Sequence, residues 1–360
     1  MRTLINGAGG RIGRAVTYEV VKAIENISVI HNGGGAYLIS LNEPRGIDFV
    51  VDNYKSRDPV HGVYDWRVEK NQNVLVLNGI PLSFSAEKDI SKIPFQDKDI
   101  EMVLECSGFF GDAKVKDPTI KLTPADNKAR EFFQYGVKKV IQTYPAKTAD
   151  VSIIMGVNHQ LYDSNKHDII SNASCTTKAL AMPLQVLLDR GINIEALSMD
   201  TTHAATASQG VLESLGQIIT HSTGAAKATG LVIPSLNGKM TGMSYRVPTL
   251  DGSFANLYFV TTSNNELTKE GINDLIRSSV DNPRYFQRIG VFEGEDAGTF
   301  DIVGRRENSI IVLSKTNVIP LPFAPEGKKA SLVTLIAGYD NELGSSVDPT
   351  LLAHYIASKN

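Results

Sequence analysis

The spacing of apolar residues in the first half of the chain predicts strands that alternate with helices. A strand is expected at 2–6, and a helix at 12–25 follows it, with Val16, Val20 and Ile24 among the residues on its apolar face. Further strands are expected at 37–41, 74–77, 82–84, 100–106, 137–142 and 151–157. This alternation is typical of an open, mostly parallel α/β sheet.

Two local signals mark where elements begin and end. Asn78-Gly79 lies between two apolar runs and predicts a hairpin turn. Thr123 followed by Pro124 predicts the start of a helix, which Gly136 is expected to end.

The pattern changes after Ser171. Long apolar strands are expected at 194–199, 257–262, 309–313 and 332–337, with few helices between them. A last helix is expected from Pro349 to Ser358, with Asp348 as its N-cap. These features predict a second domain with a largely antiparallel sheet and a boundary near Asn172.

Composition narrows the class of protein. The chain has 360 residues, of which 42% are hydrophobic and 21% charged, and its net charge is −3. We therefore expect no nucleic acid as main partner. No apolar run approaches the ~20 residues that cross a bilayer, so no membrane partner is expected. Cys106 and Cys175 are the only cysteines, which excludes a disulfide framework and predicts no metal site of the cysteine-rich kind. We expect a cytoplasmic protein.

A glycine-rich turn follows the first predicted strand. Gly7, Gly9, Gly10 and Gly13 lie between that strand and a helix, where a backbone approaches a pyrophosphate group. The loop has one residue more than the G-x-G-x-x-G pattern, and a turn without a ligand is the alternative. Glu43 ends the second strand, where an acidic side chain binds ribose hydroxyls, or it is only solvated.

The most specific segment is 171–177, Ser-Asn-Ala-Ser-Cys-Thr-Thr, which leads into an apolar helix at 178–188. The positive end of a helix dipole stabilises a thiolate at Cys175. A lone cysteine is more often a small buried apolar residue, so this position alone does not make a nucleophile.

Several strings make the chain similar to the glyceraldehyde-3-phosphate dehydrogenase family along nearly its whole length. They lie at 5–7, 11–14, 60–62, 171–177, 201–203, 223–227, 246–249 and 339–342. The resemblance implies a Rossmann-type doubly wound parallel sheet that binds NAD or NADP, at 1–172 and 342–360. It also implies an α+β catalytic domain at 173–341, with a largely antiparallel sheet.

The resemblance also implies a role for each matching residue. Cys175 would attack the aldehyde as nucleophile, and His203, 28 residues later, would act as its base. Thr206 and Arg246 would bind the phosphate of the aldehyde. The inorganic phosphate would be bound by Ser174, Thr176, Thr223 and Gly224. The cofactor would be bound by Gly7, Gly9, Gly10, Arg11, Ile12, Gly13, Glu43, Ser107 and Asn341.

The chain departs from the family's pattern at several places. Lys178 stands where the family has asparagine, so it either lowers the pKa of Cys175 or points to solvent. Ser345 replaces an aromatic residue, and Glu43 replaces aspartate. The segment 209–223 is short, 110–133 is long, and no arginine occurs between Arg190 and Arg246 for the inorganic-phosphate site.

Three functions stay open. The first is phosphorylating oxidation of glyceraldehyde 3-phosphate with NAD or NADP, by a homotetramer. The second ends in hydrolysis, as in the related erythrose-4-phosphate dehydrogenases; Glu43 and the missing arginine favour it. The third is a binding or regulatory protein with little turnover.

Overall fold

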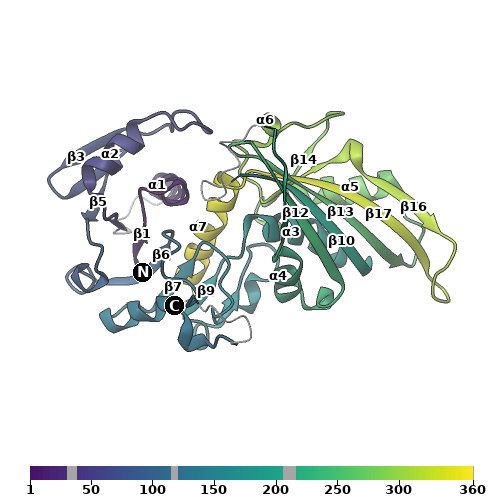
Figure 1. Cartoon of the computed structure of the whole chain (residues 1–360), viewed down its shortest axis with the longest axis horizontal. Helices are drawn as coiled ribbons and strands as arrows, with labels where there is room; N and C mark the ends of the chain where they lie inside the picture. The colour runs from purple at the N-terminus through teal and green to yellow at the C-terminus, as the bar shows by residue number, and fades with distance from the viewer. Residues whose placement is uncertain (31–38, 115–120, 206–215, 360) are drawn as a thin grey trace. The chain divides into compact units, whose positions relative to one another are not determined.

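The computed structural model describes residues 1–30, 39–114, 121–205 and 216–359, which form two compact units (Figure 1). Unit 1 comprises Met1–Ile153, Gln160–Ala173 and Pro349–Asn360. Unit 2 comprises Ile154–His159 and Ser174–Asp348.

Unit 1 is built on a nine-stranded sheet with the strand order β3-β4-β5-β2-β1-β6-β7-β9-β8. Its strands are β1 (Arg2–Asn6), β2 (Ile39–Asn42), β3 (Val68–Asn71), β4 (Val74–Leu77), β5 (Ile80–Ser85), β6 (Ile100–Glu105), β7 (Lys139–Gln142), β8 (Val151–Ser152) and β9 (Ile169–Ser171). The pairs from β5 through β8 are parallel, and β3, β4 and β5 pair antiparallel. β1 pairs with β2 on one side and β6 on the other, so the chain reverses its direction of winding there. Such a switch point is where open α/β sheets bind ligands.

The predicted elements of unit 1 are confirmed in part. Helix α1 (Arg11–Ile30) follows β1, and α2 (Ile47–Lys55) follows β2. The hairpin between β4 and β5 is confirmed, with φ of 52° at Asn78 and 83° at Gly79. Positive φ at both central residues is the requirement of a type I′ turn, which Asn-Gly meets at little cost.

The helix predicted after Thr123 is wrong in kind. Two 3-10 segments, Pro124–Asp126 and Lys128–Tyr135, replace it. Asn127 separates them, because its extended backbone lets its side chain accept a hydrogen bond from the Ala129 N–H. Gly136 does end the second segment, at a left-handed φ of 89°.

The strand predicted at 151–157 ends at Ser152. The next carbonyl, of Ile153, accepts a hydrogen bond from the Asn172 side chain instead of a neighbouring strand. The chain then turns, with the Val157 N–H bonded to the Ile154 carbonyl.

Unit 2 is built on an eight-stranded sheet with the order β11-β12-β10-β13-β17-β15-β14, and β16 pairs with β17 off this path. Its strands are β10 (Asn193–Ala204), β11 (Ile219–Ser222), β12 (Met240–Val247), β13 (Ser253–Ser263), β14 (Ile289–Phe292), β15 (Ser309–Val312), β16 (Asn317–Leu321) and β17 (Lys329–Tyr339). The pairs β10–β12 and β14–β15 are parallel and the others antiparallel, as a largely antiparallel sheet requires.

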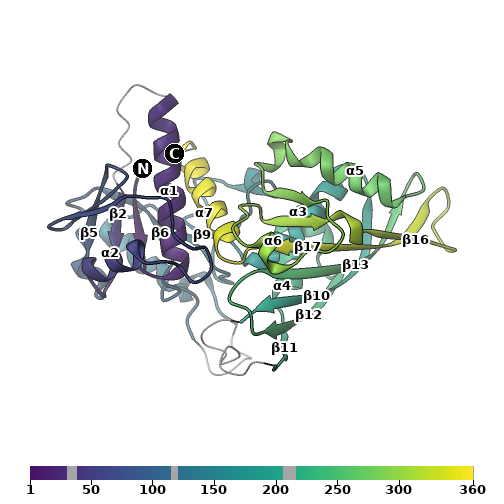
Figure 2. The same cartoon turned by 90° about the horizontal axis from the view of Figure 1, so that it is seen from above.

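Helix α3 (Cys175–Asp189) packs against β10, β13, β15 and β17 (Figure 2). Helices α4 (Ala225–Val232) and α5 (Lys269–Val280) pack beside it, and the short α6 (Thr299–Ile302) packs against β17. Every residue from Thr176 to Leu184 is buried, the charged Lys178 included, so protein surrounds this part of the helix on all sides. The sheet and its neighbours therefore hold the start of α3 in a fixed position.

The last helix begins earlier than predicted, because α7 spans Leu343–Ala357. The side chain of Asp340 accepts hydrogen bonds from the N–H groups of Glu342 and Leu343 at its start. Asp348 lies inside the helix and does not cap it; its carboxylate accepts a hydrogen bond from Asn308 and pairs with Arg288.

Candidate active site

Cys175 is the first residue of α3 in unit 2. The hydroxyl of Ser174 accepts a hydrogen bond from the Thr177 N–H at 3.1 Å and caps the helix. Ala173, just before the cap, has φ of 56°, a left-handed conformation that costs energy for a residue with a side chain. The chain therefore enters the helix through a sharp turn that presents the partly exposed thiol at the positive end of the helix dipole.

His203 lies near the end of β10 and faces this thiol. Its Nε2 lies 3.5 Å from the Cys175 Sγ, and its Nδ1 lies 2.7 Å from the Ala204 carbonyl oxygen. A carbonyl only accepts hydrogen bonds, so Nδ1 carries the proton and the Nε2 lone pair is directed at the thiol. Burial, with the charge of Arg246, lowers the pKa of His203 to about 4. The imidazole is thus neutral at pH 7 and able to accept the proton of Cys175.

A buried hydroxyl network holds the two elements together. The Tyr339 hydroxyl lies 2.9 Å from the hydroxyl of Thr176 on α3 and 2.9 Å from that of Thr201 on β10. Tyr339 and Thr201 lie in sequence motifs that the chain shares with the family, but nothing in the sequence predicted that they link α3 to β10. Tyr339 fixes the distance between the helix that carries the nucleophile and the strand that carries the base.

Arg246 of β12 is the register partner of His203 on the neighbouring strand. One nitrogen of its guanidinium donates to the Ala204 carbonyl at 3.1 Å. Its Nε is buried and has no hydrogen-bond partner within the described part of the chain. A buried, unsatisfied cationic donor is suited to an anion such as a phosphate. Thr206, its predicted companion, lies outside the described residues.

The two other predicted phosphate-binding residues lie at the start of α4. The Thr223 hydroxyl accepts a hydrogen bond from the Ala225 N–H at 3.1 Å, and Gly224 is exposed. In the described parts of the chain no hydrogen bond joins either residue to Cys175. Their place at a helix N-terminus agrees with an anion site but does not establish one.

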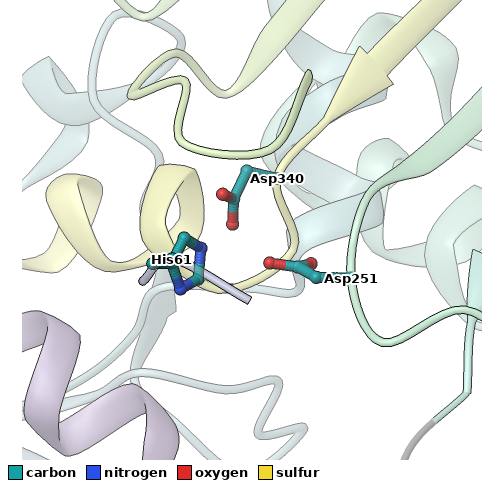
Figure 3. A group of neighbouring side chains, drawn as sticks. All are labelled: His61, Asp251 and Asp340. Carbon is teal, nitrogen blue, oxygen red and sulfur yellow. The ribbon is translucent and has the colours of Figure 1, made fainter. Parts of the chain in front are cut away.

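Asn341 follows β17 and is held from two sides. Its side-chain oxygen accepts a hydrogen bond from the Ser253 hydroxyl at 3.0 Å, and its backbone N–H donates to Asp251 at 3.1 Å. Figure 3 shows Asp340 at the end of β17 and Asp251 on the segment that leads into β13. The Asn341 amide NH₂ makes no hydrogen bond to any described residue, so it remains a free donor for a carboxamide.

The glycine loop of unit 1 has the close packing of a nucleotide-binding turn. A Cβ at Gly7, whose φ is 81°, would lie 2.9 Å from the Ser107 backbone. A Cβ at Gly13 would lie 2.0 Å from the Gly7 carbonyl oxygen, so only glycine fits there. Gly10 lies in the turn itself, and Arg11 and Ile12 form the first turn of α1, with its N–H groups directed at the loop.

Glu43 directly follows β2 and is almost fully buried. Its carboxylate accepts a hydrogen bond from the Gly9 N–H at 3.0 Å and pairs with Arg45 at 2.7 Å. Burial would raise the pKa of Glu43, but the hydrogen bonds and charge of Arg45, together with the Gly9 N–H, lower it below its ordinary value. The carboxylate is therefore ionised and tied to the glycine loop; the alternative of a merely solvated side chain is wrong.

Glu105, at the end of β6, is a further buried carboxyl that sequence reasoning missed. It accepts hydrogen bonds from the Asn6 side chain at 2.6 Å and from the N–H groups of Ser107 and Gly108. Burial raises its pKa to about 7. Glu105 joins the ends of β1 and β6 and fixes Ser107 beside Gly7.

These features fit a dinucleotide, because a glycine turn lies at the sheet's switch point before a helix N-terminus. A thiol next to a neutral imidazole fits covalent aldehyde chemistry. Together they indicate the class: an NAD-dependent oxidoreductase.

Comparison with known proteins gives the family. The profile of the glyceraldehyde 3-phosphate dehydrogenase NAD binding domain matches residues 1–113, and that of the C-terminal domain matches residues 174–341. The chain belongs to the glyceraldehyde-3-phosphate dehydrogenase family. It is 36% identical to glyceraldehyde-3-phosphate dehydrogenase 1 of Bacillus subtilis, over 99% of this chain and 98% of that protein. It is 33% identical to glyceraldehyde-3-phosphate dehydrogenase of Priestia megaterium, over the same shares.

Among the described residues, no helix has the length and apolar character needed to span a membrane.

Proposed function

We propose that the chain oxidises D-glyceraldehyde 3-phosphate to 1,3-bisphosphoglycerate, with inorganic phosphate as second substrate and NAD or NADP as hydride acceptor. One observation carries this proposal. The sulfur of Cys175, at the start of α3, lies 3.5 Å from Nε2 of the neutral His203 on β10. Its support comes also from the unsatisfied Nε of Arg246, on the strand next to His203.

The first step joins the aldehyde to the enzyme. His203 Nε2 takes the thiol proton while the sulfur attacks the aldehyde carbon, which forms a thiohemiacetal oxyanion. The protonated imidazole and the backbone N–H of Cys175 at the helix N-terminus are the donors that stabilise this oxyanion. Arg246 and Thr206 bind the aldehyde's phosphate and so set which carbon meets the sulfur.

The second step oxidises the adduct. The glycine loop and Glu43 would hold NAD, which would supply the acceptor for the hydride of the thiohemiacetal carbon. His203 first gives the thiol proton to the oxyanion, which makes the thiohemiacetal hydroxyl, and takes that proton back as the hydride leaves and the carbonyl re-forms; Cys175 then carries a thioester. The free amide NH₂ of Asn341 is suited to orient the carboxamide of the cofactor, so that one face receives the hydride.

The third step releases the product. An inorganic phosphate oxygen attacks the thioester carbon, the carbon–sulfur bond breaks, and the acyl phosphate leaves Cys175 as a thiolate. Ser174, Thr176, Thr223 and the Gly224 N–H are the groups proposed to hold this phosphate. We expect the enzyme to act as a homotetramer in the cytoplasm, as the family resemblance implies.

A second candidate ends the same chemistry with water in place of phosphate. No arginine occurs between Arg190 and Arg246, although the family takes an arginine for the inorganic-phosphate site from this segment. The product then is 3-phosphoglycerate, and erythrose 4-phosphate becomes a candidate substrate.

One assay separates the candidates. Cofactor reduction is followed with glyceraldehyde 3-phosphate, with and without phosphate, and the products are identified. The proposal expects phosphate-dependent turnover, an acyl phosphate product and full loss of rate after iodoacetamide treatment. Phosphate-independent turnover to the acid would support hydrolysis. Turnover that iodoacetamide does not affect would contradict both candidates.

A further inference from the structure

Two departures from the family pattern meet in the interior of unit 2. Lys178 lies one helical turn after Cys175 on α3 and is fully buried. Its ammonium group donates to the Ser345 carbonyl oxygen at 2.9 Å and lies 3.1 Å from the Ser345 hydroxyl oxygen. The alternative that Lys178 points to solvent is therefore wrong. Ser345 occupies the position of a larger aromatic residue in the family, and its small side chain gives the ammonium group both an acceptor and space.

Among the residues that the structure describes, the ammonium group of Lys178 has no carboxylate as direct partner. Within the described ranges, no carboxylate oxygen lies within ion-pair distance of its Nζ, and both of its hydrogen bonds are to neutral oxygens. The acidic group that acts on it from α7, Asp348, pairs with Arg288 at 3.5 Å and accepts a hydrogen bond from Asn308 at 2.7 Å. Burying a cation without a carboxylate partner costs folding free energy. We therefore expect another group nearby that becomes an anion and that this charge stabilises.

The Cys175 thiol becomes an anion in the reaction and lies one turn before Lys178 on the same helix. The residues are three apart on one helix, and helical side chains lean toward the N-terminal turn, which places the ammonium group on the thiol's side of Lys178. Burial raises the pKa of Cys175 above its ordinary value, and the charge of Lys178 is foremost among the influences that oppose this rise. Thr176 lowers it as well, whereas Asp251 raises it.

His203 does not supply this charge in the resting enzyme. Its pKa of about 4 leaves it neutral at pH 7. Burial lowers the pKa of Lys178 to about 8, while Asp348 and Cys175 raise it and Arg288 lowers it. At pH 7 the lysine is thus still mostly protonated, so it is a cation at the moment when His203 removes the proton of Cys175.

We propose that Lys178, held in place by Ser345, supplies the positive charge that stabilises the Cys175 thiolate in this chain. Lys178 acts through Cys175 and touches no reacting atom, so it is a positioning residue. His203 remains the base that removes the proton, and Lys178 makes the resulting anion more stable. The inference rests on the proposed function only in taking Cys175 as the nucleophile.

The test measures the thiol without any substrate. In a Cys106→Ser background, the pKa that Cys175 has beside a protonated Lys178 is obtained from thiolate ultraviolet absorbance and iodoacetamide alkylation rates measured below about pH 8, the pKa of Lys178. Lys178→Met keeps the side-chain length and removes the charge, and Ser345→Ala removes one of the two hydrogen bonds. Lys328→Met is the matched control. Lys328 lies directly before β17, and its ammonium group donates a hydrogen bond to the Asn264 side chain and not to Ser345.

We expect Lys178→Met to raise the pKa of Cys175 by about one unit, as loss of a nearby opposite charge does. Alkylation at pH 7 then slows only about threefold, because a thiolate of higher pKa is also the stronger nucleophile. Ser345→Ala gives a smaller rise, and Lys328→Met gives none. An unchanged pKa in folded Lys178→Met overturns the proposal. If Lys178→Met does not fold, an unchanged pKa of Cys175 in Ser345→Ala overturns the proposal. Neither outcome bears on whether phosphate or water completes the reaction.

Discussion

Replacing His203 by asparagine isolates the base of the reaction. The asparagine NH₂ keeps the hydrogen bond that Nδ1 donates to the Ala204 carbonyl, whereas the Nε2 that lies 3.5 Å from the Cys175 sulfur is lost. A positioned general base contributes about 10²–10⁴ to the rate, so the hydride-transfer rate should fall about 10³-fold. The thiol and the rest of the site stay in place.

The pH dependence follows from the same geometry. The pKa of His203 lies at about 4, against an ordinary value of 6.5, which corresponds to about 3 kcal/mol against charging the buried ring. At pH 7 only about one imidazole in a thousand is protonated. The acid limb of kcat/KM in the free enzyme should therefore lie below about pH 5, and not near 6.5.

The shift also predicts how stability changes with pH. Between the unfolded pKa of 6.5 and the folded value of about 4, the unfolded chain binds more protons at this histidine. As the pH falls from about 6.5 to about 4, the preference of the folded chain for a neutral His203 therefore lowers the free energy of unfolding by up to about 3 kcal/mol. His203→Asn lacks this loss, so urea unfolding at pH 7 and pH 4.5 should show a smaller decrease in stability for the variant than for the parent.

Single-turnover stopped-flow measurements of cofactor reduction between about pH 4.5 and 8 check the kinetic part. A rate within tenfold of the parent would refute the assignment of His203 as base. An acid limb near 6.5 that disappears in His203→Asn would refute the neutral, buried imidazole.

Three further predictions concern the nucleophile, the cofactor and the second substrate. Cys175→Ser should lower activity more than ~10³-fold, while Cys106→Ser keeps it; the reverse result would refute the choice of nucleophile. The ionised Glu43 favours the ribose hydroxyls of NAD over the phosphate of NADP, whereas Arg45, which pairs with Glu43, would reverse this preference if it bound that phosphate instead; we expect kcat/KM to be higher with NAD and Glu43→Gln to narrow the difference, and a preference for NADP would contradict this. The Michaelis constant for inorganic phosphate should exceed that of relatives with the arginine by about tenfold or more, since one charge-assisted hydrogen bond is worth about 1.5–3 kcal/mol; an equal constant would show that the arginine is not needed.

Sequence reasoning reached furthest where the signal was local. The Asn78-Gly79 hairpin, the glycine turn after β1 and the cap before Cys175 each depend on neighbouring residues. It failed where distant residues decide. Whether Lys178 is solvated or buried depends on Ser345, which lies 167 residues later.

The remaining errors have the same cause. Asp348 precedes a proline and resembles an N-cap, but Asp340 caps α7 first and Arg288 takes the Asp348 carboxylate. The helix expected after Thr123 has the right ends, yet Asn127 bonds locally and divides it into 3-10 segments. Such competition between local and tertiary hydrogen bonds is not visible in a hydrophobic pattern.

The proposed reaction requires Cys175 to carry the oxidised substrate as a thioester before phosphate releases it. Intact-protein mass spectrometry tests it most directly, on enzyme mixed with glyceraldehyde 3-phosphate and NAD in phosphate-free buffer and quenched in acid. We expect one 3-phosphoglyceroyl group per subunit, located on the Cys175 peptide and lost within a turnover when phosphate is added. Cofactor reduction without any acyl group on Cys175, or an acyl group on another residue, would contradict it.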